Sequence, residues 1–131
     1  MILNISKNHN TQKGRRLCNM LKVSNNIIKM TKGDSAVFNV DIAFADGTPY
    51  TLKSGDKLKM TVRRRIGSEV LLKSESTTNT ITLTHDMTSK LVPGNCVYDI
   101  ELKTSAGEVY TVIGLTDNST YNMYVVGEVT E

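Results

Sequence analysis

Alternation of apolar and polar side chains is the clearest pattern along this chain. Between residues 35 and 44, an apolar side chain occupies every even position. A period of two residues is typical of a β-strand that has one face on a core and the other in water. The same alternation recurs at 57–63, 80–84 and 96–103, so the sequence predicts at least four amphipathic strands.

Turn residues (Gly, Pro, Asp and Asn) separate these segments. After the strand at 80–84, residues 85–91 predict a single helical turn with Asp86 as its N-terminal cap. A polar loop is expected at 116–120. Shorter strands are expected at 27–30, 70–72, 109–113 and 121–126, and residues 50–52 are a candidate for a short paired segment.

Seven or eight strands between residues 26 and 131 predict an antiparallel β-sandwich or a small β-barrel. The strands are amphipathic, which argues against a parallel sheet covered on both faces. Residues 26–131 therefore form one expected domain. Its predicted core comprises Phe38, Val40, Ile42, Leu58, Met60, Val62, Ile81, Leu83, Tyr98, Ile100 and Leu102.

Composition strengthens the all-β interpretation. Val, Ile and Thr together account for 37 of the 131 residues, and β-branched side chains favour a pleated strand over a helix. No apolar run approaches the ~18 residues that a membrane-spanning helix requires. A secretory signal with an apolar stretch is also missing from the first residues, so we expect no membrane partner and synthesis in the cytoplasm.

Charge is unevenly distributed along the chain. Residues 1–25 contain five basic side chains and no acidic one, whereas residues 26–131 contain 11 basic and 13 acidic side chains. A nearly neutral domain argues against nucleic acid as a partner. The basic N-terminal segment has no hydrophobic period, which predicts a disordered tail. Residues 13–16 (KGRR) also match the translation of a purine-rich ribosome-binding sequence, so the native chain is hypothesised to start at Met20.

Candidate chemistry is sparse. The only histidines are His9 and His85, and neither stands in a motif with a nucleophile. The Cys and His residues do not have metal-ligand spacing, and the glycines do not form a phosphate-binding loop. The sequence therefore predicts no catalytic residues, no metal site and no cofactor. Of the two cysteines, Cys96 is expected to be a buried, inert thiol.

Two groups of residues remain as interaction candidates. Arg63, Arg64 and Arg65 form the densest positive cluster of the domain, which suits an acidic partner or simply blunts a strand edge. Exposed tyrosines stack on sugars or anchor protein interfaces, but in a β-sandwich they are also common as half-buried strand residues. The tyrosines in question are Tyr110, Tyr121 and Tyr124.

The order of strands and turns from residue 28 to 129 resembles a known family. The resemblance rests on a KGDS turn at 32–35, a DGTPYTL turn at 46–52 and an LKMTVR strand at 58–63. It continues with ITLT at 81–84, LVPG at 91–94 and the paired YDIEL and GEVYT segments that follow. These patterns resemble the N-terminal domain of upper baseplate proteins from tailed phages of Gram-positive bacteria.

This resemblance implies an immunoglobulin-like β-sandwich without an active site. It also implies a structural role in the virion tail, as a baseplate adaptor that anchors receptor-binding proteins and assembles into trimers. Family members often continue into a further C-terminal part, whereas this sequence ends soon after its last expected strand. The alternative from the residues alone is a stand-alone carbohydrate- or surface-binding β-sandwich that uses the tyrosines.

Overall fold

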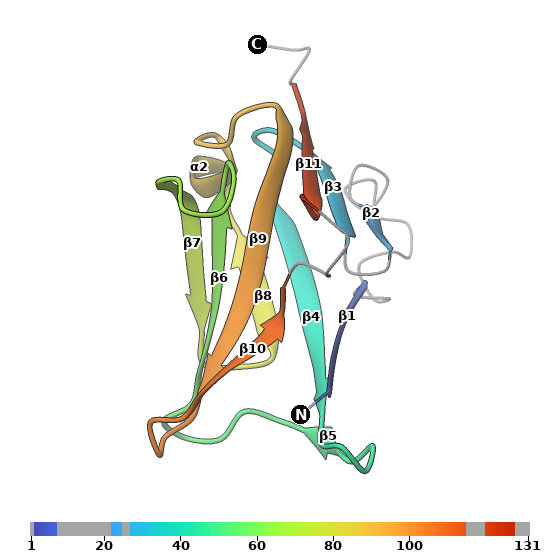
Figure 1. Cartoon of the computed structure of the whole chain (residues 1–131), viewed down its shortest axis with the longest axis vertical. Coiled ribbons are helices and arrows are strands. Elements are labelled where there is room, and N and C mark those ends of the chain that lie inside the picture. The colour runs from blue at the N-terminus through green and yellow to red at the C-terminus, as the bar shows by residue number, and fades with distance from the viewer. Residues whose placement is uncertain (1, 8–21, 25–26, 115–119, 128–131) are drawn as a thin grey trace.

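Two β-sheets pack face to face along the long axis of the molecule (Figure 1). This computed structural model describes residues 2–7, 22–24, 27–114 and 120–127. The described part is all β apart from one short helix, which confirms the expected fold class. No helix in these ranges is long and apolar enough to cross a membrane.

The smaller sheet is built around one long strand. Strand β4 (Ala36–Ala43) pairs on one edge with β1 (Ile2–Lys7) and on the other with β8 (Thr80–Leu83) and β5 (Pro49–Tyr50), all antiparallel. Strands β8 and β5 meet opposite ends of β4, so β4 is the only strand that connects the members of this sheet.

The larger sheet is organised by the ten-residue strand β9 (Gly94–Lys103). One edge of β9 pairs with β6 (Lys57–Arg63), which pairs in turn with β7 (Val70–Ser76). The other edge pairs at its start with β11 (Met123–Val126) and at its end with β10 (Val109–Ile113). Two more strands, β3 (Ile27–Thr31) and β2 (Lys22–Ser24), extend the sheet beyond β11.

One strand pair differs from the antiparallel arrangement expected throughout. Strands β3 and β11 are parallel, with Met123 opposite Ile28 and Val125 opposite Met30. Residues 26–131 form nine strands in the described part, β3 to β11, against the seven or eight expected. The ninth is the two-residue β5, in the segment where a short paired stretch was only a candidate, because so short a strand has no hydrophobic period to reveal it.

The hydrophobic core lies between the sheets and includes all eleven residues predicted for it. Each of those side chains is at most 3 % exposed. Phe44 was expected to continue the alternation of β4, but it lies beyond the end of that strand and is 41 % exposed. The alternating pattern therefore predicted the buried face of β4 correctly, but it placed the end of the strand one residue too late.

Helix α2 (His85–Thr88) confirms the expected helical turn but corrects its cap. The side chain of Thr84, not Asp86, accepts a hydrogen bond from the Met87 amide. His85 Nδ1 lies 2.7 Å from the Gly33 carbonyl oxygen, so this ring tethers the helix to the turn before β4. The structure gives His85 a structural role at this boundary.

The N-terminal segment differs from the disordered tail that its composition suggested. Strands β1 and β2 both lie within residues 1–25 and pair with β4 and β3. Backbone hydrogen bonds form these ladders whatever the side chains, so a polar sequence can still add an edge strand. Residues 8–21, which include Met20 and Cys18, and most of the expected 116–120 loop lie outside the described residues.

Two asparagine side chains take over inter-strand hydrogen bonds at places where the backbones of the two strands do not pair directly. Asn122 accepts from the Tyr98 amide at 2.8 Å and donates to the Tyr98 carbonyl at 2.9 Å, between β11 and β9. Asn79 donates to the carbonyls of Val40 and Tyr50 at 3.2 and 3.1 Å, in the gap between β8 and β5. The Asn79 Oδ1 also accepts from the Leu52 amide at 2.9 Å, so each amide side chain both donates and accepts, as a peptide group does.

Candidate interaction surfaces

The arginine cluster lies at the turn from β6 to β7, at the upper end of the molecule (Figure 1). Arg63 ends β6 and donates to the Ser68 carbonyl, and the Ser68 hydroxyl lies 2.8 Å from the Arg65 carbonyl. These bonds close the turn and leave Arg64 and Arg65 exposed. The turn therefore presents two free cationic side chains, while Arg63 folds back over the sheet.

A shallow depression adjoins this turn on the outer face of the larger sheet. Its volume is about 390 Å³, and its walls include Arg63, Ile66, Val97, Asp99 and Thr111. Burial, followed by the nearby Glu101 carboxylate, raises the pKa of Asp99, while Arg63 and Lys59 act in the opposite direction. The depression therefore combines a partly desolvated carboxyl group with one cationic side chain.

Cross-strand charge pairs continue below the depression. Lys59 on β6 stands opposite Glu101 on β9 and opposite Glu75 on β7. Asp99, Glu101 and Lys103 share the outward phase of β9. This face presents alternating charge, which is typical of a surface in contact with water.

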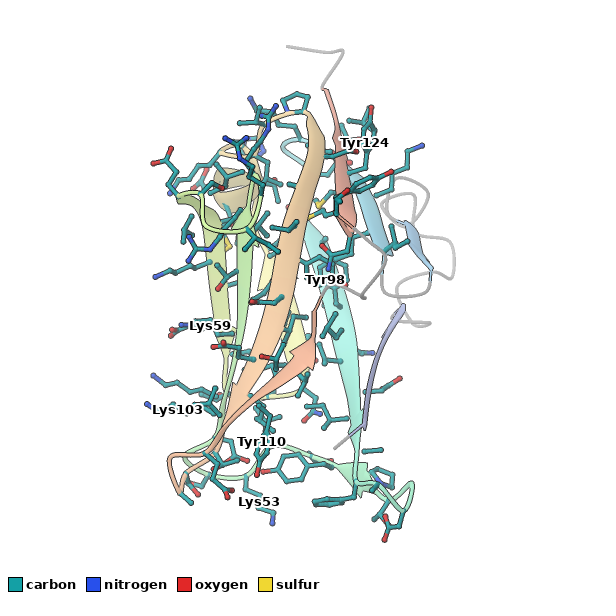
Figure 2. All side chains as sticks on the ribbon, in the orientation of Figure 1. Lys53, Lys59, Tyr98, Lys103, Tyr110 and Tyr124 are labelled. Carbon is teal, nitrogen blue, oxygen red and sulfur yellow. The ribbon has the colours of Figure 1, made fainter. Side chains whose placement is uncertain are left out.

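The three candidate tyrosines do not form one cluster. Tyr110 lies on β10 at the lower end, whereas Tyr124 lies on β11 at the upper end (Figure 2). Tyr121 lies just before β11, so it belongs with Tyr124. All three side chains are exposed, and the Lys29 ammonium lies 5.9 Å from the centre of the Tyr124 ring. Any tyrosine-dependent binding site would therefore use one end of the molecule.

A second aromatic group, which no sequence pattern revealed, is centred on Tyr50 near Tyr110 at the lower end. The rings of Phe44 and Tyr50 meet edge to face with centres 5.5 Å apart. The Lys53 ammonium lies 5.6 Å from the centre of the Tyr50 ring, and Figure 2 shows Lys53 and Tyr110 both at the lower end of the molecule. These residues come from the β4–β5 turn, the segment before β6 and β10, so no local sequence pattern joins them.

Asp56 holds this lower end together. Its side chain is 2 % exposed, and its Oδ2 accepts hydrogen bonds from the Tyr50 hydroxyl and the Lys53 amide, the latter at 2.9 Å. Its Oδ1 accepts from the Ser105 amide at 2.9 Å, across in the β9–β10 hairpin. One buried carboxylate therefore joins the segment between β5 and β6 to the β9–β10 hairpin, which is distant in sequence.

These hydrogen bonds shift both titrating groups. The Lys53 amide, followed by the Tyr50 hydroxyl, lowers the pKa of Asp56 below its ordinary value. The bond to Asp56, with burial, raises the pKa of Tyr50 to about 12. The ionised carboxylate and the neutral phenol are therefore the forms that the folded chain favours.

We expect Asp56→Asn to lower the melting temperature by roughly 5 to 10 °C, because an amide cannot accept all three hydrogen bonds. The effect should depend on pH. The Asp56 contribution is complete above the ordinary Asp pKa of about 3.9 and is lost as the pH falls through the lower, folded pKa. Circular dichroism melts of both chains from pH 7 to pH 2 should show the difference shrinking at acid pH.

The control is the Tyr50→Phe variant, whose stability is followed at alkaline pH. Because the folded pKa of Tyr50 is raised, its contribution is complete below pH 10 and is lost as the pH rises to about 12. In Tyr50→Phe, stability should no longer fall between pH 10 and pH 12. The loss of stability at acid pH should remain, because Asp56 still accepts from the Lys53 and Ser105 amides. If the melting temperature of each variant differed from that of the native chain by the same amount at every pH, the Tyr50–Asp56 hydrogen bond would not have the role assigned to it.

Two further kinds of candidate chemistry are a reactive thiol and a metal site. Cys96 is a buried free thiol, as expected, and burial raises its pKa to about 11. Within the described ranges, no three His, Cys, Asp or Glu side chains gather closely enough to hold a metal ion. Neither a scan against protein-family models nor a search of curated proteins gives a match to this chain.

Proposed function

We propose that this protein is a non-enzymatic structural component of a phage or prophage tail, most specifically a baseplate adaptor that anchors receptor-binding proteins. The basis is the resemblance of residues 28–129 to the N-terminal domain of upper baseplate proteins. On this proposal the chain is made in the bacterial cytoplasm and joins the virion tail. Its partners are other tail proteins and further copies of itself, as a trimer.

The observation that carries this proposal is the placement of exposed apolar side chains at two opposite ends. The β4–β5 turn and the β9–β10 hairpin lie at the lower end, and the β6–β7 turn, the α2–β9 connection and β11 lie at the upper end (Figure 1). The lower group comprises Phe44, Val109 and Tyr110; the upper group comprises Ile66, Val92 and Tyr124. The two other exposed apolar side chains, Ile27 and Tyr121, lie at the start of β3 and just before β11, between the two ends.

An adaptor needs two contact surfaces separated by a stiff body. Sheets of this length, packed around a continuous core, keep the two ends at a fixed distance. The charged ladder between them favours water, whereas exposed aromatic side chains at the ends supply the anchors that protein interfaces use. The larger sheet therefore acts as a spacer in the proposed adaptor.

The strand pairing also supports an immunoglobulin-like arrangement within the β-sandwich. Such folds place strands A, B and E in one sheet and G, F, C and C′ in the other. Here β1, β4 and β8 are neighbours in the smaller sheet, and β11, β9, β6 and β7 are neighbours in the larger one. On the proposed correspondence β1 takes the place of strand A, beside strand B.

Mass spectrometry of density-purified particles from an induced culture of the source bacterium tests the proposal. We expect peptides from residues 26–131 in the particle fraction, at a stoichiometry typical of a tail component. Abundant protein in the cell lysate with none in the particles would overturn the baseplate assignment.

The second candidate function is carbohydrate binding at the lower end. It is favoured by the exposed Tyr110 ring near Tyr50, which packs edge to face on Phe44, since aromatic faces stack on sugars. The sequence has no Trp, so tyrosine fluorescence reports directly on such binding. A glycan that quenches the native protein and Tyr121→Ser equally, but not Tyr110→Ser, would favour this function over the adaptor role.

A further inference from the structure

The depression beside the β6–β7 turn is formed by three neighbouring strands of the larger sheet. Strand β9 supplies its floor, β6 and the β6–β7 turn supply one wall, and the end of β10 supplies the other (Figure 1). Its volume of about 390 Å³ lies in the range of sites that hold small molecules. The hollow is therefore large enough for one small ligand.

Two side chains of opposite charge line the depression. Arg63 stands opposite Val97 in the β6–β9 register, and Asp99, two residues further along β9, stands opposite Thr61. The two charged residues are therefore diagonal neighbours on one face of the sheet, with Cα atoms about 7 to 8 Å apart. Among the residues that the structure describes, no hydrogen bond or ion pair reaches the Asp99 carboxylate. Both charges are thus available to a ligand that lies between them.

The Asp99 carboxylate is not fully compensated in the free protein. Burial, followed by the Glu101 carboxylate on the same strand, raises its pKa, while Arg63 and Lys59 on β6 oppose this shift. From β10, the uncharged Thr111 lines the depression. Every fully buried side-chain polar atom in the described part has a hydrogen-bond partner, so the unpartnered Asp99 oxygens are accessible from outside. A cationic group bound here would replace the hydration that this carboxylate has lost.

The Arg63 side chain has donors left for an anionic group. A guanidinium carries five N–H donors, and one of its terminal nitrogens donates here to the Ser68 carbonyl. This bond fixes the side chain against the β6–β7 turn. A planar guanidinium binds a carboxylate through two parallel hydrogen bonds, so the remaining donors suit a ligand carboxylate at this wall.

Apolar surface completes the lining. Val97 has the outward phase of β9 but is only 6 % exposed, so it lies at the base of the depression. Ile66 lines the depression from the turn and is 77 % exposed. An aliphatic group packed against these two side chains would remove apolar surface from water.

We propose that this depression binds a free α-amino acid with an aliphatic side chain. The ligand ammonium group contacts the Asp99 carboxylate, and the ligand carboxylate contacts the Arg63 guanidinium. The aliphatic side chain packs against Val97 and Ile66. This inference goes beyond the proposed function and does not depend on it, because it uses only the residues of this depression.

Nuclear magnetic resonance titration of the isotope-labelled full chain with L-norvaline tests the site. We expect saturable shifts of the backbone amides of Val97, Asp99 and Thr111, with a dissociation constant of the order of millimolar. Butylamine has the same carbon chain with only the positive charge, and pentanoate has only the negative charge. Each should bind at least about tenfold more weakly than norvaline.

Two outcomes of the titration would overturn the proposal. One is the absence of saturable shifts at these amides. The other is equal affinity for norvaline and butylamine, or for norvaline and pentanoate, because the site would then recognise a single charge and not an amino acid.

Variants assign the two ligand charges to their partners. Asp99→Asn removes the partner of the ammonium group, and Arg63→Lys keeps the positive charge but loses the paired donors. Each should weaken norvaline binding at least about fivefold. The matched controls are Glu101→Gln and Arg64→Lys, since neither residue lines the depression. They should change the affinity by no more than about twofold. Equal effects of the controls and the site variants would show that norvaline binds elsewhere.

Discussion

Replacing Asn122 with aspartate is expected to destabilise the fold by about 3 to 5 kcal/mol at neutral pH, the largest single effect in this chain. Asn122 is buried, and its amide group completes the ladder between β11 and β9 by bonding both backbone groups of Tyr98. An aspartate keeps the acceptor but loses the donor, so a buried carboxylate oxygen would face the Tyr98 carbonyl oxygen.

The pH dependence of this variant distinguishes charge repulsion from a simple loss of packing. Burial and the facing carbonyl should raise the folded pKa of the introduced carboxyl above its unfolded value of about 4. Between these two pKa values, the free energy of unfolding of the variant should fall relative to that of the native chain by about 1.4 kcal/mol for each pH unit. At pH 4 and below, the protonated acid can donate to Tyr98 as the amide does, and most of the loss should be recovered.

Urea unfolding followed by circular dichroism from pH 4 to pH 7 measures both effects. Asn95→Asp is the matched control, because Asn95 is an exposed asparagine on β9, opposite Tyr124 of β11. It should change stability by no more than about 0.5 kcal/mol at any pH in this range. A loss at Asn122 that is the same at pH 4 and pH 7 would show that it comes from packing and not from repulsion between the carboxylate and the Tyr98 carbonyl.

How far the fold follows from the sequence is clear from the contrast between Val40 and Asn122. Val40 lies in a run where every second residue is apolar, and that period alone identifies its buried face. Asn122 is just as buried, but a polar residue before a short strand gives no sign that its side chain replaces a peptide group. Local periodicity therefore predicts the sheet faces, while the bonds between sheet segments depend on tertiary placement.

The candidate sites also divide into features that a local sequence pattern reveals and features that depend on tertiary placement. The sequence marks Arg63, Arg64 and Arg65 as one charged cluster, and the structure leaves Arg64 and Arg65 exposed, whereas Arg63 is partly buried and bonds the Ser68 carbonyl. The group around Tyr50 was missed, since Phe44, Asp56 and Tyr110 come from three separate segments. The parallel pairing of β3 with β11 was missed for the same reason, because it joins the first and last parts of the domain.

Gly55 shows how closely those separate segments fit, and Gly55→Ala is expected to destabilise the protein by about 3 kcal/mol. The backbone at Gly55 has a φ of +92°, in the region that favours glycine. A Cβ atom at this position would lie only 2.8 Å from the Ser105 Cβ in the β9–β10 hairpin. The next residue, Asp56, bonds the Ser105 amide, so movement to relieve the overlap would also stretch that bond.

Gly47→Ala separates the backbone effect from the steric one. Gly47 has a nearly identical φ of +90°, but a Cβ there would meet no atom within 4 Å. This control should therefore lose only the conformational part, about 1 to 2 kcal/mol, when both variants are unfolded in urea under the same conditions. The difference between the two variants measures how tightly the segment before β6 is held against the hairpin. Equal losses would mean that the hairpin moves aside freely, and the lower end could then not serve as the fixed contact surface that the adaptor proposal requires.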